Sequence, residues 1–187
     1  MIEERENFFV LTGCSGAGKS TIIEALRARG FLCLDEPGRK IVEEQLLCGG
    51  SATPWQDLRK FGELLFSRYV RLFEQVTDRI QPVFFDRALP EVITISRFLN
   101  HPVPERHLMA VKEHRYARKV FITPPWPEIF KTDRERRHSF EDALAEYRLT
   151  PEIYREFGYQ LIEVPKAPVP ERADFILGQV RTPGIGR

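Results

Sequence analysis

The sequence contains few cysteines, almost no net charge and no long hydrophobic run. Its 3 cysteines have no metal-ligand spacing, and their odd number argues against a disulfide framework. Reduced thiols are typical of a cytoplasmic protein, so we expect that location. The net charge is +1, and no global positive field therefore favours a nucleic-acid partner. No apolar stretch has the length that crosses a membrane, and the acidic N-terminal residues lack the charge pattern of a signal peptide.

The sequence also lacks internal repeats, low-complexity tracts and an interdomain linker. Its length of 187 residues fits one domain. Hydrophobic residues make up 42% of the chain, which is enough to form a sizeable core. We expect a single domain over residues 1–180 and a flexible tail over residues 181–187, where proline and glycine gather.

The most informative segment that is present is Gly13-Cys14-Ser15-Gly16-Ala17-Gly18-Lys19-Ser20, followed by Thr21. It fits G-x-x-x-x-G-K-[ST], the phosphate-binding loop of P-loop nucleotide enzymes. Glycines let the backbone wrap around an anion, and the N–H groups then form a nest for phosphate oxygens. The motif predicts that Lys19 reaches the β- and γ-phosphates and that the Ser20 hydroxyl coordinates Mg²⁺. The predicted nucleotide-binding residues are Gly13, Ser15, Gly16, Ala17, Gly18, Lys19, Ser20 and Thr21.

The segments that flank this loop have the order that the motif requires. Residues 8–12 are an apolar, β-prone run, and a helical pattern follows the loop until Gly30. Further along the chain, short apolar runs alternate with helical patterns, which predicts a parallel sheet covered by helices on both faces. We expect further strands at 31–34, 82–86, 120–122 and 161–164, and helices at 39–47, 54–77, 90–99, 104–114, 139–147, 152–157 and 171–180.

Signatures of several other P-loop classes are missing. The sequence has no Asn-Lys-x-Asp motif of regulatory GTPases and no Leu-Ser-Gly-Gly-Gln signature of transport ATPases. The strand at 82–86 ends in Asp86-Arg87 rather than Asp-Glu, so the hydrolytic glutamate of motor-type ATPases is absent. A small-molecule kinase is the best-populated class that remains.

Two predicted strands end in residues suited to phosphoryl transfer, which needs positioning and charge neutralisation. Asp86 would face the nucleotide and help hold Mg²⁺, although a turn or capping role is the alternative. Arg87 would hold a phosphate or the acceptor, or pair with a carboxylate on the surface. After the second strand, Asp35 or Glu36 would take the acceptor's proton. Strand alternation lets one of the two point inward, and we favour Glu36.

Two further sets of charged residues are candidates for contact with the substrates. Arg39 would bind the acceptor or remain a surface charge. The arginine-rich segment 131–138 follows the fourth strand, where small kinases carry a mobile lid that closes on the phosphates. We expect a lid at about 127–140 with Arg134 and Arg137 as its phosphate contacts; a solvated helix face is the alternative.

These motifs together resemble a known family, the small P-loop domains related to the ribosylnicotinamide kinase portion of NadR. Such domains are described as AAA-type ATPases or predicted kinases. The likeness covers nearly the whole chain and includes an Asp-Arg step that is also similar to that of deoxynucleoside kinases. It rests on residues 9–21, 36–39, 84–91, 120–126, 133–136, 154, 158–159 and 162–165.

The resemblance implies a P-loop NTPase three-layer α/β sandwich with a five-stranded parallel sheet in the kinase-like order 2-3-1-4-5. It also implies ATP, or GTP in its place, with Mg²⁺ and a carboxylate at Asp86. We expect a phosphotransferase that acts on a small hydroxyl-bearing or nucleotide-like acceptor. A regulatory nucleotide-binding protein with slow hydrolysis and a protein partner is the alternative, and the sequence leaves the acceptor and the oligomeric state open.

Overall fold

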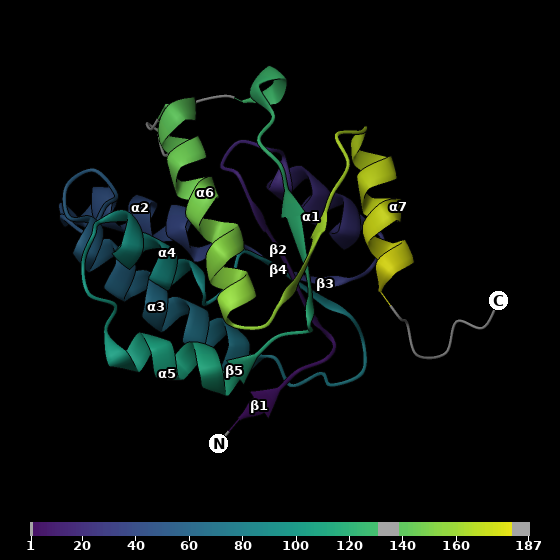
Figure 1. Ribbon diagram of the computed structural model, residues 1–187, viewed down its shortest axis with the longest axis horizontal. Helices are drawn as coiled ribbons and strands as arrows, with labels where there is room; N and C mark the ends of the chain where they lie inside the picture. The colour runs from purple at the N-terminus through teal and green to yellow at the C-terminus, as the bar shows by residue number, and fades with distance from the viewer. Residues whose placement is uncertain (1, 131–138, 181–187) are drawn as a thin grey trace.

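A five-stranded parallel sheet forms the centre of the protein in the computed structural model, which describes residues 2–130 and 139–180 (Figure 1). Numbered along the chain, its strands lie in the order 2-3-1-4-5, which confirms the predicted kinase-like order. In spatial order the strands are β3 (Leu32–Leu34), β4 (Val83–Asp86), β2 (Phe8–Gly13), β6 (Lys119–Thr123) and β7 (Gln160–Glu163).

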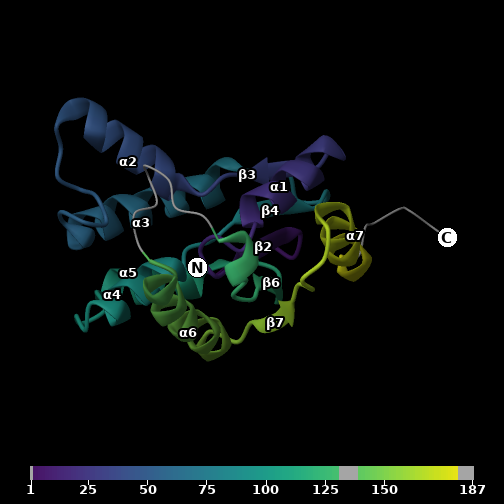
Figure 2. The ribbon, with the colours of Figure 1, turned by 90° about the horizontal axis from the view of Figure 1, so that it is seen from above.

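Helices cover both faces of this sheet and make three layers (Figure 2). The central strands β2 and β4 are buried along their whole length, as expected for apolar runs in a parallel sheet. One face packs on α1 (Lys19–Ala28) and α7 (Val169–Gln179). The other face packs on α2 (Pro37–Cys48), α3 (Leu58–Gln75), α4 (Glu91–Phe98), α5 (Glu105–Glu113) and α6 (Phe140–Glu156).

The register of the strands brings their carboxyl ends to one edge of the sheet. Leu11 pairs with Asp86 and Gly13 with Thr123, while Leu34 pairs with Phe85. The phosphate-binding loop after β2 therefore lies beside the ends of β4 and β6. This is the edge at which open α/β sheets bind their ligands.

The predicted helix break at Pro151 is wrong, and α3 begins at Leu58 rather than at residue 54. The two helical segments expected on either side of Pro151 form one helix, α6, with Pro151 inside it. An interior proline removes a hydrogen bond and costs about 3 kcal/mol or more. The helix continues because Ile153 and Tyr154, which follow the proline, are fully buried in the core. A capping box of Ser139 and Asp142 begins the same helix.

Two short strands were not predicted. Residues Glu3–Glu4 (β1) and His114–Arg115 (β5) pair in parallel and form a separate two-stranded sheet. A strand of two residues carries no periodicity that a sequence pattern could reveal. A turn of 3₁₀ helix, η1 (Pro127–Ile129), follows β6.

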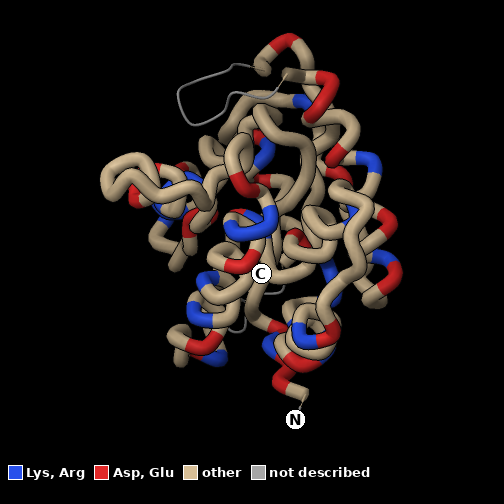
Figure 3. The backbone as a smooth tube through the Cα atoms, turned by 90° about the vertical axis from the view of Figure 1, so that its left-hand side faces the viewer, with Lys and Arg blue, Asp and Glu red and all other residues tan. Residues whose placement is uncertain are grey.

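Charged residues of both signs intermix along the backbone in the view of Figure 3, with no region of one sign on the described chain that faces the viewer. This distribution agrees with the net charge of +1. Among the described residues, no helix has both the length and the apolar character needed to span a membrane.

Candidate functional site

The phosphate-binding loop has the backbone conformation that its glycines allow. Gly13 has a φ of +121°, and a Cβ placed there would lie 2.3 Å from the carbonyl oxygen of Thr123. Only glycine fits such a position without strain. Gly18, with a φ of +80°, ends the loop as the N-cap of α1. The loop therefore leads directly into a helix N-terminus, where the helix dipole favours an anion.

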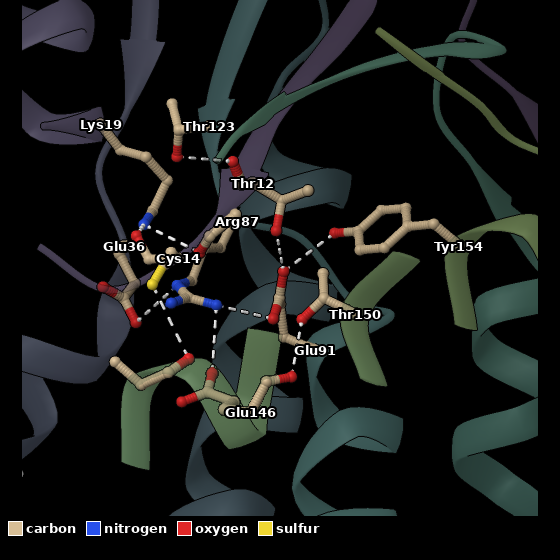
Figure 4. Close-up of polar contacts among 12 residues, drawn as sticks. Thr12, Cys14, Lys19, Glu36, Arg87, Glu91, Thr123, Glu146, Thr150 and Tyr154 are labelled. Atoms are coloured by element: carbon tan, nitrogen blue, oxygen red, sulfur yellow. Dashed lines mark hydrogen bonds and ion pairs between the residues drawn. The ribbon is translucent and has the colours of Figure 1, made fainter. Parts of the chain in front are cut away.

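Lys19 folds back onto this loop. Its Nζ donates to the carbonyl oxygens of Gly13 at 3.1 Å and Cys14 at 2.8 Å (Figure 4). Burial of the ammonium lowers the pKa of Lys19 to about 8. The ammonium group of Lys19 therefore lies beside the loop, and both of these hydrogen-bond partners are neutral carbonyls.

Asp86 and Ser20 meet at the start of α1. The Ser20 hydroxyl donates to Asp86 Oδ2 at 3.3 Å, and burial raises the pKa of Asp86 to about 6. The other carboxylate oxygen, Oδ1, is buried and has no hydrogen-bond partner among the described residues. A hydroxyl and a carboxylate are the oxygen ligands that Mg²⁺ prefers, so these two side chains fit the metal that the motif predicts.

Arg87 is buried rather than exposed on the surface, and three carboxylates surround it (Figure 4). Its Nη1 lies 2.8 Å from Glu91 Oε2 and 3.3 Å from Glu146 Oε1, and its Nε lies 3.7 Å from Glu36 Oε1. Arg87 thus pairs with carboxylates, as the predicted alternative had it, but in the interior rather than on the surface. The backbone φ of Arg87 is +63°, a conformation that is costly for a residue with a Cβ.

Glu91 is a central residue of this network that the sequence analysis did not single out. Its side chain is 3% exposed and accepts hydrogen bonds from the hydroxyls of Thr12 and Tyr154, the latter at 3.2 Å. It therefore connects the strand before the phosphate-binding loop to α6. The sequence contained one signal for this ion pair. Glu91 follows Arg87 by four residues and is the first residue of α4.

The structure separates the two candidate acidic residues after β3. Asp35 is exposed and pairs with Arg27 at 2.6 Å. Glu36 turns the other way, toward Arg87, and lines a cavity beside the loop. The alternation argument therefore identified the residue that points inward. Arg39 lines the same cavity from α2, where it is largely exposed.

This cavity has a volume of about 390 Å³ and opens next to Ser15 of the phosphate-binding loop. Its walls come from α2, α3, α4 and α6 and are largely apolar. Its charged lining residues among those described are Glu36, Arg39, Arg87, Glu91, Asp142 and Glu146, and its aromatic ones are Trp55, Phe61, Tyr69 and Phe98.

A pair of aromatic rings also contacts the loop. A Cβ on Gly16 would lie 2.4 Å from the Phe130 ring, so the ring rests on the backbone at that residue. Phe130 also packs edge-on against Phe140, with ring centroids 5.2 Å apart. The described ends of the predicted lid at 127–140 thus contact the loop and each other. Arg134 and Arg137 lie outside the described residues.

Arg172 on α7 is a second residue that the sequence analysis missed. It is 4% exposed, donates from Nη1 to the carbonyl of Ala17 at 3.2 Å, and lies over the Trp126 ring at 5.3 Å from the centroid. Arg172 thereby connects α7 and the segment after β6 to the loop. Arg172 lies 155 positions from Ala17 in the sequence, so no local pattern could relate it to the loop.

Comparison with known proteins places the chain in a family. A family model described as "AAA domain" matches residues 8–172. The chain belongs to this AAA-domain family. The match begins at β2 and ends at Arg172, so it includes the loop, Asp86 and the carboxylate network of this AAA domain. The more specific resemblance to the ribosylnicotinamide kinase domain is not confirmed, and no curated protein matches the sequence.

Solved structures similar to this AAA domain include several kinases. Thymidylate kinase from Candida albicans has 14% sequence identity and a TM-score of 0.64, with 94% of this chain and 91% of that chain covered. Deoxyadenosine kinase from M. mycoides, with dCMP and dCDP bound, has 13% identity and a TM-score of 0.61 over 92% and 97%. Shikimate kinase from Acinetobacter baumannii has 16% identity and a TM-score of 0.54 over 94% and 93%. At these identities the likeness confirms the P-loop kinase fold.

Proposed function

We propose that the protein is a P-loop kinase that transfers the γ-phosphate of a Mg-nucleotide to the hydroxyl of a small acceptor. The observation that carries this proposal is that Ser15 of the phosphate-binding loop and the carboxylate of Glu36 line one cavity of about 390 Å³. A donor phosphate on the loop and an acceptor in the cavity would then be neighbours. The fold that the protein shares with the kinases described above also supports this proposal.

In this proposal the loop residues bind the donor nucleotide, ATP or GTP. The backbone N–H groups of Gly13, Ser15, Gly16, Ala17 and Gly18, with Ser20 and Thr21 at the helix start, would surround the phosphates. Lys19 would exchange its two carbonyl partners for phosphate oxygens. Ser20 and Asp86 would hold Mg²⁺, which neutralises charge on the phosphates when bound.

Glu36 would act on the acceptor. As the acceptor oxygen bonds to the γ-phosphorus and the bond to the departing ADP or GDP breaks, the hydroxyl proton would pass to the Glu36 carboxylate. Arg87, 3.7 Å from Glu36, would hold that carboxylate in place, and Arg39 would contact the acceptor at the rim. Arg134 and Arg137 are proposed to contact the transferred phosphate from the lid.

The test is a coupled assay of ADP or GDP release with nucleosides, nucleoside monophosphates, pyridine ribosides and sugars. At least one acceptor should stimulate release. Glu36→Gln should lower the stimulated rate by roughly 10²–10⁴-fold, the usual contribution of a general base. Asp35→Asn is the matched control, because it removes a neighbouring charge that pairs with Arg27 outside the cavity. Release that no acceptor stimulates would instead favour a regulatory NTPase.

A further inference from the structure

The cavity beside the phosphate-binding loop carries an excess of negative charge. Among its described lining residues, carboxylates belong to Glu36, Glu91, Asp142 and Glu146, and guanidinium groups only to Arg39 and Arg87. Asp142 and Arg39 are both exposed at the rim, where water and salt screen them. The less exposed part therefore contains Glu36, Glu91 and Glu146 around a single guanidinium, that of Arg87.

Arg87 is not available to an anionic acceptor. Its side chain is 8% exposed, and three carboxylates lie within 3.7 Å of its nitrogens. A phosphate or carboxylate on the acceptor would have to displace one of them and leave it in a partly buried place without its cation. Among the described residues, the inner cavity thus offers an incoming anion repulsion from carboxylates and no unengaged cation.

The remaining wall suits a flat ring that carries no negative charge. Trp55, Phe61, Tyr69 and Phe98 supply aromatic surface. The Tyr69 side chain is 1% exposed and its hydroxyl is buried, so Tyr69 contributes mainly apolar surface to this wall. The volume of about 390 Å³ lies at the small end of ligand pockets.

We infer that the acceptor is an unphosphorylated alcohol of nucleoside size, neutral or cationic, that contains a planar ring. Its hydroxyl lies at Glu36, and its ring packs between the aromatic side chains. This inference rests on the proposed kinase function and restricts its substrate class. It excludes nucleoside monophosphates and ring carboxylates as preferred acceptors.

The test compares matched pairs of acceptors that differ by one phosphate. Each nucleoside of a panel is paired with its 5′-monophosphate, and shikimate represents ring carboxylates. Binding is measured by quenching of Trp55 fluorescence in a Trp126→Phe background with a non-hydrolysable ATP analogue present, and transfer by ADP release. The best nucleoside should have a dissociation constant at least about tenfold lower than its monophosphate, and a transfer rate at least about tenfold higher.

Two variants relate this preference to the cavity. Glu146→Gln should reduce the discrimination against the monophosphate several-fold, whereas Glu141→Gln, on the exposed side of α6, should leave it unchanged. Retained thermal stability of each variant shows that it is folded.

The outcomes separate this inference from the kinase proposal. Tighter binding and faster transfer with a monophosphate or with shikimate would overturn the inference and leave the kinase proposal intact. Preferential binding of the nucleoside without any transfer would support the inference about the cavity and count against the kinase proposal. Failure of every nucleoside to bind would overturn the inference as well.

Discussion

The guanidinium of Arg87 and the carboxylate of Glu91 form an ion pair of 2.8 Å, and each side chain is less than a tenth exposed. The pair joins the end of β4 to the first turn of α4, and Glu91 extends it to Thr12 and Tyr154. The carboxylate of Glu91 is thus shared by β2, α6 and the turn after β4. Its removal would affect both the stability and the shape of the site.

Replacement of Glu91 should therefore be severe. Glu91→Ala leaves Arg87 with its two more distant carboxylates and removes an acceptor of two hydroxyls, and we expect a loss of about 3–5 kcal/mol in the free energy of unfolding. Glu24→Ala removes the partner of Arg27 in an exposed pair and should cost less than about 1 kcal/mol. Chemical denaturation of both variants measures the difference. A Glu91 variant as stable as the wild type would show that the network is not structural.

Two glycines with positive φ, one crowded and one in open space, allow the cost of crowding to be assessed. Gly13→Ala would place a Cβ 2.3 Å from the Thr123 carbonyl, whereas a Cβ on Gly30, with a φ of +90°, meets no atom within 4 Å. Gly30→Ala should cost about 1–2 kcal/mol from conformation alone. Gly13→Ala should cost clearly more, since β2 and β6 must separate. Thermal melts of the two variants test this order, and equal losses would contradict it.

The buried Asp86 should make stability depend on pH. Its pKa is about 6 in the folded protein against 3.8 ordinarily, so between these values the folded state binds the extra proton and stability falls as pH rises. Asp86→Asn should remove this contribution. We expect the unfolding free energy of the wild type to decline relative to that of Asp86→Asn between about pH 4 and pH 6. Denaturation curves at pH 4, 5 and 6 provide the comparison; parallel pH profiles would refute it.

Lys19 should produce the opposite slope at higher pH. Its pKa is about 8 in the folded protein against 10.5 ordinarily, so the unfolded state binds the extra proton between these values. Stability of the nucleotide-free protein should therefore gain from Lys19 as pH rises through this window. Lys19→Met should lack the gain, and urea denaturation between pH 8 and 10 measures it in both proteins. A wild-type profile that matches Lys19→Met would contradict the prediction.

Arg172 should support the phosphate-binding loop from outside the motif. Arg172→Ala removes the donor to the Ala17 carbonyl and the cation over Trp126, a contact worth about 0.5–2 kcal/mol. We expect lower thermal stability and several-fold weaker binding of a fluorescent ATP analogue. Arg29→Ala, which removes a more exposed pair with Asp174 on the same face, is the control and should leave nucleotide binding unchanged.

The sequence predicted those parts of the site that lie on short local patterns. The loop motif, the apolar runs and the alternation at Asp35 and Glu36 each depend on neighbouring residues. The structure agrees with the order of strand, loop and helix and with the inward direction of Glu36, while the roles of these residues stay predictions. The contacts of Glu91 with Thr12 and Tyr154 join residues 79 and 63 positions apart, and periodicity carries no information about such pairs. The same reason applies to Arg172 and to the strand β1. The prediction of a helix break at Pro151 failed because core packing outweighs the local cost of a proline inside a helix.

The edge-on contact between Phe130 and Phe140 has a consequence for how such a protein can diversify. These rings bring residues 130 and 140 together at a fixed point on the loop. When the ends of a segment are anchored, a doubling of its length costs only about 0.6 kcal/mol. Segments of other lengths and sequences could thus be exchanged between these two phenylalanines while the sheet, the core and the carboxylate network keep their places.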